Sequence, residues 1–120
     1  MSSTLYELLG GETGITQIVE DAVNAHLNNP VIQSRFQHGA NIERAKKMSV
    51  QFFCAGSGGP QSYSGRDMVS AHQGMNISEQ EFMAVVDDVL EALDKNAIGA
   101  EARQQVLSIL YGLKGQIIRI

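Results

Sequence analysis

His72 is the residue of this chain whose type and setting best suit chemistry. It follows GGPQSYSGRDMVSA, a stretch rich in turn formers at residues 58–71, and it lies four residues after Met68. On a short helix that begins near Arg66, the two side chains would share a face. Spacing alone is more typical of a core or surface histidine. However, the four phenylalanines and several methionines in the middle of the chain predict apolar surroundings, and histidine ligation in an apolar cavity is what haem binding requires.

Other reactive groups are less promising. The glycine-rich segment lacks the G-K-[ST] ending of a phosphate loop, and Pro60 removes a backbone donor, so we expect it to form a turn that lets the chain swing freely before the next helix. Cys54 follows two phenylalanines, which predicts a buried and inert thiol. Asp87 and Asp88 fall between apolar positions and are expected on a solvated helix face. His26 and His38 are expected at the surface.

Composition narrows the class of protein. The chain has 120 residues and a formal net charge of −4, which predicts a single domain over residues 1–120 and argues against nucleic-acid binding. Its one basic cluster, RAKK at residues 44–47, could still meet a small anionic group. We expect a cytoplasmic protein, because no apolar run suits a membrane span or a signal peptide and the single cysteine fits a reducing compartment.

Apolar spacing predicts helices along most of the chain. One helix is expected over about residues 13–27 and is stopped by Asn29–Pro30, with VIQSRF at 31–36 as an irregular or one-turn segment. A second begins near Ile42 and ends at the glycines that start with Gly56. A third opens with a capping box at Ser78 and Glu81 and stops near residue 96, and the last covers about residues 102–117. Because no alternating β-branched run occurs, the fold class is all-α.

Several motifs together resemble the truncated haemoglobins, specifically their first group. They are LYELLGG near the start, FF at 52–53, GGPQSYSGRDMVSAHQGMNIS at 58–78 and EFMAVVDDVLEAL at 81–93, and the likeness extends from Leu5 to about Ile117. The resemblance implies a globin-like two-over-two helical sandwich of antiparallel helix pairs around one haem b. It also implies a diatomic gas ligand (O₂, NO or CO) and an unidentified reductase or electron donor.

The same resemblance assigns roles to individual residues. His72 matches the proximal iron ligand, and Arg44 and Lys47 match the basic residues that reach the haem propionates. The other matched positions contact the haem or line its proximal wall and the adjoining loop; these are Phe36, Phe52, Phe53, Tyr63, Met68 and Phe82.

The distal side departs from the family pattern. Val23 stands where many members carry a tyrosine, and Ser49 and Ala45 stand where a glutamine and a gate-like residue are expected. A tyrosine–glutamine network stabilises O₂ through hydrogen bonds, so O₂ stabilisation by that route is not expected here. Met48 occupies the position from which some relatives supply a second axial ligand. Methionine is a competent soft ligand, although a flexible core filler is the favoured interpretation.

Three functions remain open at this point. The leading one is a gas-binding haem protein with an apolar distal pocket, suited to oxygen binding or transport or to NO chemistry; the resemblance also allows nitric oxide dioxygenation. The alternative is a six-coordinate His72–Met48 haem protein for electron transfer or redox sensing. A third is a globin fold that has lost haem and serves as an interaction module.

Overall fold

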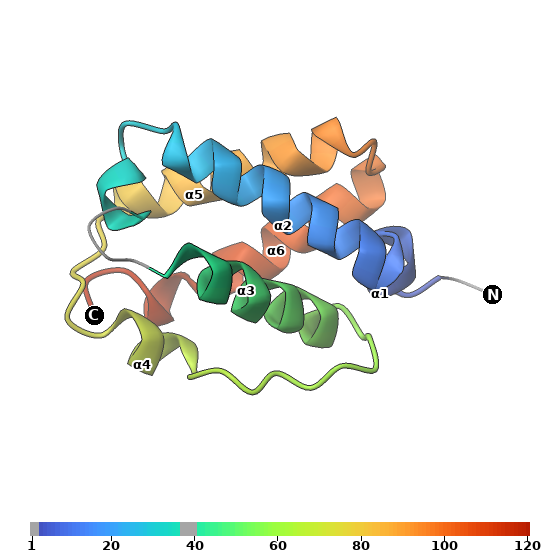
Figure 1. The fold of residues 1–120 in the computed structure, drawn as a ribbon, viewed down its shortest axis with the longest axis horizontal. Helices are drawn as coiled ribbons and strands as arrows, with labels where there is room; N and C mark the ends of the chain where they lie inside the picture. The colour runs from blue at the N-terminus through green and yellow to red at the C-terminus, as the bar shows by residue number, and fades with distance from the viewer. Residues whose placement is uncertain (1–2, 37–40) are drawn as a thin grey trace.

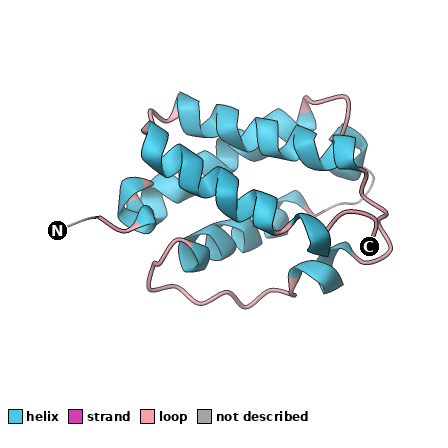
Figure 2. Ribbon diagram, turned by 180° about the vertical axis from the view of Figure 1, so that it is seen from behind, coloured by secondary structure: helices cyan, strands magenta, loops and turns pink. Residues whose placement is uncertain are grey.

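The described part of the chain folds into helices, and a long loop joins two of them. A computed structural model describes residues 3–36 and 41–120. The helices are α1 (Leu5–Leu8), α2 (Gly11–Leu27), η1 (Gln33–Phe36), α3 (Ile42–Gly56), α4 (Met68–His72), α5 (Glu79–Lys95), α6 (Ala100–Gly112) and η2 (Lys114–Gln116). Within the described residues no strand forms (Figure 2). One isolated bridge joins Ile77 to Ile118. The all-α prediction is confirmed.

Two antiparallel helix pairs make up the body of the molecule. α2 runs beside α3 in the opposite direction, and α6 runs back along α5 after a short turn at residues 96–99 (Figure 1). α2 also packs along α5, which joins the two pairs. This arrangement is the expected two-over-two sandwich. The short α4 lies outside the pairs, beside η2 near the C-terminus.

Two glycines allow the sharp entry into α2. Gly10 and Gly11 have φ angles of 92° and 66°, a region that L-residues with a side chain avoid. Behind them, buried side chains recur at three- and four-residue steps along one stripe of α2. That stripe consists of Ile15, Ile18, Val19, Ala22, Val23 and His26. Burying each large aliphatic side chain contributes about 1.5–3 kcal/mol, so this stripe fixes α2 against its neighbours.

Local sequence signals set the limits of the later helices. The predicted capping box of α5 is present, with Ser78 and Glu81 each bonding the other's backbone N–H, and α5 ends at its C-cap Asn96. The last helix is shorter than predicted, because α6 stops at Gly112 and the chain continues as the 3₁₀ turn η2. Glycines at 112 and 115 weaken helix propagation there. η2 instead brings Ile117 back toward α4.

The long loop between α3 and α4 is anchored, so the expectation of a freely swinging arm is wrong. The Gln61 amide donates to the Tyr6 hydroxyl at 3.0 Å, and Ser64 donates through both its backbone N–H and its hydroxyl to Gln51 on α3. Gly59 lies so close to the Tyr6 ring that a Cβ there would clash with it at 2.5 Å. The loop therefore holds α4 in a fixed position.

No helix in the described residues is long and apolar enough to cross a membrane.

Candidate functional site

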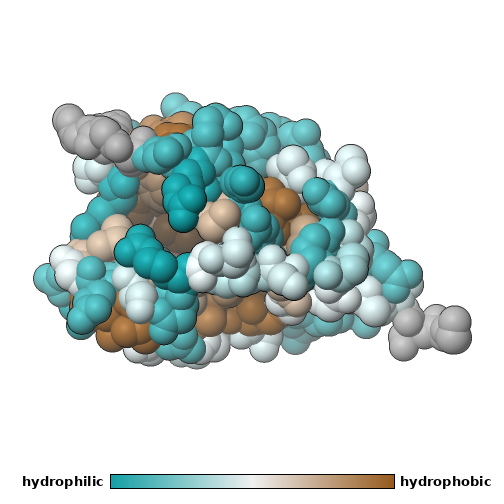
Figure 3. All heavy atoms as spheres, turned by 60° about the horizontal axis from the view of Figure 1, so that its bottom comes forward, coloured by the Kyte–Doolittle hydropathy of each residue, from teal (hydrophilic) through white to brown (hydrophobic). Residues whose placement is uncertain are grey.

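Three cavities in the described part of the chain share His72 in their walls. Their volumes are about 140, 280 and 340 Å³. The first lies toward η1, α5 and η2, the second toward α2 and α3, and the third opens between α3 and α4. Figure 3 shows the side of the molecule that carries α4, where apolar residues lie deep in a hollow between polar ones. His72 therefore borders all three cavities.

The imidazole of His72 is oriented by a bond within its own helix. Its Nδ1 lies 2.8 Å from the main-chain oxygen of Met68. Because a carbonyl oxygen can only accept, Nδ1 must carry the hydrogen, and the lone pair is then on Nε2. The N-cap residue Asp67 begins α4 by accepting a hydrogen bond from the Ser70 N–H at 3.1 Å. This tautomer is the one that metal-binding histidines adopt when their second nitrogen is hydrogen-bonded.

The walls around His72 suit a flat apolar group such as haem. Phe36, Phe52 and Phe53 line the cavity beside α2 and α3, and each is only half-buried by the protein itself. Met68 lines the same cavity, whereas Phe82 is buried and lines the cavity beside η1. A b-type haem requires broad apolar walls around the ring and one imidazole nitrogen that can bind the iron. The residues present therefore fit that group.

On the α2 and α3 side, the predicted distal residues meet in one cavity. Val23, Ala45 and Ser49 all line it together with His72. Among the described residues, the polar side chains in this wall belong to His26, Ser49 and His72. A serine hydroxyl is short, so this side offers an unusually apolar environment to a small ligand.

Met48 and Tyr63 occupy the mouth of the site. Both line the cavity that opens between α3 and α4, with His72 in the same wall, but neither lines the cavity that contains Val23. The Tyr63 hydroxyl donates to the main-chain oxygen of Arg66 at 2.6 Å, and its ring meets the edge of Phe52 with centroids 5.4 Å apart. Tyr63 therefore fixes the loop against α3.

Two arginines form the cationic rim of that mouth. Arg44, predicted from the RAKK cluster, lines it, and so does Arg66, which the sequence pattern did not single out. Lys47 is exposed and lines none of the three cavities. Its neighbour Lys46 pairs with Glu20 at 3.0 Å. Guanidinium groups at such a rim can bind carboxylates such as haem propionates.

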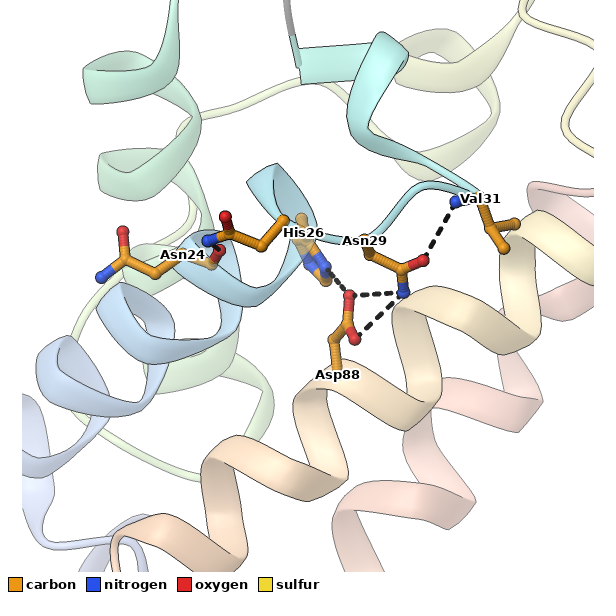
Figure 4. Close-up of polar contacts among 6 residues, drawn as sticks. Asn24, His26, Asn29, Val31 and Asp88 are labelled. Atoms are coloured by element: carbon orange, nitrogen blue, oxygen red, sulfur yellow. Dashed lines mark hydrogen bonds and ion pairs between the residues drawn. The ribbon is translucent and has the colours of Figure 1, made fainter.

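His26 and Asp88 are buried, so the expectation that both are solvated is wrong. Their exposed fractions are 6% each, and His26 Nδ1 lies 2.7 Å from an Asp88 oxygen (Figure 4). Asp87 is exposed as expected, and His38 lies outside the described residues. The missed signal is positional: residue 26 extends the apolar stripe of α2 by one turn beyond Val23. Burial lowers the pKa of His26, and the nearby Asp88 partly opposes this.

A second missed pair closes the η1 side. Arg35 holds Glu81 with two bonds, Nε to Oε2 at 2.6 Å and Nη2 to Oε1 at 3.0 Å. This bidentate contact lowers the pKa of Glu81 to about 2. Both residues line the cavity beside η1, so the pair ties η1 to the start of α5 across the cavity wall. The sequence pattern predicts Glu81 only as a capping residue.

Two further features concern thiol and metal chemistry. Cys54 is fully buried, as predicted, and burial raises the pKa of its thiol, which keeps it protonated and unreactive. Across residues 3–36 and 41–120, no cluster of three His, Cys, Asp or Glu side chains could hold a metal ion.

Comparison with known proteins points to one family. Residues 4–119 match the bacterial-like globin family. The group 1 truncated haemoglobin of Mycolicibacterium paratuberculosis is 30% identical over 96% of this chain and 84% of its own length, and that of a Nostoc species is 28% identical over 97% and 98%. The truncated haemoglobin structure of Tetrahymena pyriformis in its Fe(III) form superposes with a TM-score of 0.93 at 22% identity, covering 98% of this chain and all of that one.

Proposed function

Because the chain belongs to the bacterial-like globin family, among the group 1 truncated haemoglobins, we propose that it binds one haem b at His72 and a diatomic gas at the haem iron. The observation that carries this proposal is the convergence of three cavities on His72, whose Nδ1–H is occupied by the Met68 carbonyl. The free Nε2 is then available as the proximal ligand. When bound, the haem supplies the site for the gas.

The chain's own residues divide the remaining tasks. The aromatic walls at Phe36, Phe52 and Phe53 would exclude water from the group between them. Arg44 and Arg66 would hold its propionates at the mouth. In this assignment Arg66 takes the place that the family resemblance gives to Lys47.

The distal side supports a preference among gases. O₂ is retained by strong hydrogen-bond donors, whereas CO and NO depend on them far less. Here Val23 and Ala45 can donate nothing, and Ser49 has only a short hydroxyl. We therefore infer tight CO and NO binding relative to O₂, together with fast autoxidation. This profile favours NO chemistry or sensing over oxygen transport and weakens the case for nitric oxide dioxygenation. A cytoplasmic location and a separate reductase remain part of this proposal.

A six-coordinate haem is the second candidate, and one observation favours it: Met48 and His72 line the same cavity. The five-coordinate form is preferred, because Met48 lies at the mouth beside Arg44 and Arg66 and does not line the cavity that contains Val23. The thioether would act there as an adaptable apolar cover.

The test is a haem titration followed by a gas-binding series. Apoprotein and haem should combine one to one, and the ferrous ligand-free protein should show the single broad visible band of five-coordinate haem. O₂ should dissociate much faster than CO. Failure to bind haem would leave the third interpretation, a haem-free interaction module, and would refute the proposal.

A further inference from the structure

His26 presents a polar edge to an otherwise apolar cavity. It lies one turn after Val23 on the same stripe of α2, and its ring lines the cavity that also contains Val23, Ser49 and His72. The ring stacks on Phe36 with centroids 5.1 Å apart and planes 21° apart. Phe36 lines the same cavity, so the two rings form one continuous part of its wall.

A network behind His26 fixes which ring nitrogen carries the hydrogen. One Asp88 carboxylate oxygen lies 2.7 Å from His26 Nδ1. Both carboxylate oxygens also accept hydrogen bonds from the Asn29 side-chain Nδ2, each at 3.2 Å. The side-chain oxygen of Asn29, Oδ1, in turn accepts a hydrogen bond from the backbone N–H of Val31 at 3.0 Å, which sets the orientation of the side-chain amide (Figure 4). Facing a carboxylate oriented in this way, Nδ1 is the donor. The lone pair is therefore on Nε2.

That Nε2 has no hydrogen-bond partner among the described residues. A ligand in the cavity that carries a hydrogen could therefore donate to this nitrogen, and such a bond would stabilise the ligand. Because the nitrogen carries a lone pair and no hydrogen, it can accept a hydrogen bond or a proton but cannot donate to O₂, NO or CO. The ligands that it would favour are those that bring a proton.

Burial favours the neutral form of the His26 imidazole, against the pull of its one charged partner. Asp88 faces it from α5, and on η1 the Arg35 guanidinium is occupied by Glu81. From α3, the residues in the shared cavity are the uncharged Ala45, Ser49, Phe52 and Phe53, and α4 contributes His72. Burial lowers the pKa of His26 despite the opposing effect of Asp88.

We propose that His26, oriented by Asp88, is the proton acceptor of this cavity for small protic ligands of the class HX, such as hydrogen cyanide, hydrogen sulfide and hydrogen peroxide. The H–X bond breaks, its electron pair stays on X, and the proton forms an N–H bond at Nε2. With haem held at His72, X⁻ would be the species that the ferric iron takes up, and the Asp88 carboxylate would stabilise the imidazolium that remains. This inference rests on the proposed function, because it needs haem at His72.

The test compares a protic ligand with an aprotic one. Association of cyanide with the ferric protein and of CO with the ferrous protein would be followed by stopped flow from pH 5 to 9. The variants are His26→Leu, and His26→Gln as a control that keeps a hydrogen-bonding group but cannot take a proton. At pH 7 both substitutions should slow cyanide association by about 100-fold, within the usual range for a positioned base, while CO association changes less than about twofold. Asp88→Asn should slow cyanide by a smaller factor.

A second measurement remains available even if the variants fold poorly. Nitrogen-15 NMR of the wild-type ferrous CO protein should show His26 with Nδ1 protonated and Nε2 unprotonated. Equal cyanide rates in wild type and His26→Gln, or a proton on Nε2, would overturn the inference. Either result with normal CO binding would leave the proposed function intact, whereas failure of the wild type to bind haem or CO would refute the proposed function itself.

Discussion

The Nδ1 atom of His72 lies 2.8 Å from the main-chain oxygen of Met68, one turn earlier on the five-residue helix α4. This contact uses the imidazole N–H within its own helix and leaves the lone pair on Nε2, on a residue that lines three cavities. A helix this short has little stability of its own, so its N-cap and the anchored loop before it determine how precisely the ring is held. The geometry of α4 is therefore directly tied to haem binding.

Removing the cap of α4 should loosen haem. Asp67→Ala deletes the acceptor for the Ser70 N–H and should destabilise α4 by about 1 kcal/mol. We expect haem dissociation, measured by transfer to apomyoglobin, to accelerate roughly fivefold. Asp67→Ser keeps a capping oxygen and is the matched control. Equal dissociation rates in Asp67→Ala and Asp67→Ser would contradict the role assigned to the cap.

The cationic rim should contribute to haem affinity in a salt-dependent way. Arg44→Gln and Arg66→Gln each remove a guanidinium from the mouth and should each weaken haem binding by about fivefold at low salt, roughly 1 kcal/mol for an exposed ion pair. Lys47→Gln removes the same charge from an exposed position outside the three cavities and should have no effect. If Lys47→Gln weakened haem binding as much as Arg66→Gln, this assignment of the rim would be wrong.

A donor placed in the distal cavity should restore O₂ retention. Ser49→Gln introduces an amide that can donate toward a bound gas, and one such bond is worth about 1–1.5 kcal/mol. Flash photolysis should therefore show O₂ leaving about tenfold more slowly, with CO dissociation nearly unchanged. Ser49→Leu adds similar bulk without a donor. Slower O₂ release in the leucine variant would attribute the effect to crowding instead.

The Arg35–Glu81 pair should make the fold sensitive to acid. The pKa of Glu81 is about 2 in the folded state, below the ordinary glutamate value near 4.5. The stabilisation of the fold by the ion pair is therefore complete above pH 4.5 and is lost as the pH falls toward 2. The free energy of unfolding, measured with urea, should fall more steeply between pH 5 and 3 for the wild type than for Glu81→Gln. The glutamine can still form the capping box with Ser78. Parallel pH profiles would show that the pair contributes nothing.

Much of the fold follows from local patterns in the sequence. The apolar stripe of α2 and the capping box at Ser78 are signals within one turn or two of helix, and both were predicted with nearly correct limits. The early end of α6 was missed, because the spacing of Leu113 and Ile117 continues the helical period while glycines at 112 and 115 interrupt the helix. At this point the apolar spacing predicts a continuing helix, whereas the low helix propensity of glycine favours its end, and the structure follows the propensity.

The candidate site was harder to predict where it depends on contacts between distant segments. His26 and Asp88 are 62 residues apart, and a histidine and an aspartate each look like surface residues until folding brings them to 2.7 Å. Arg66 reaches the mouth because the loop at residues 57–67 is pinned to Tyr6 and Gln51, which no short-range pattern reveals. Lys47, only three positions from Arg44, lines none of the three cavities.

The visible spectrum of the ferrous, ligand-free protein tests the central claim most directly, because it reports the ligands of the iron. Wild type and Met48→Ala should show the same single broad band of five-coordinate haem. His72→Gly should lose that spectrum and regain it when free imidazole is added, since the small ligand can occupy the vacated position. A split six-coordinate spectrum in the wild type that collapses in Met48→Ala, or an unchanged spectrum in His72→Gly, would contradict the assignment of His72 as the sole protein ligand.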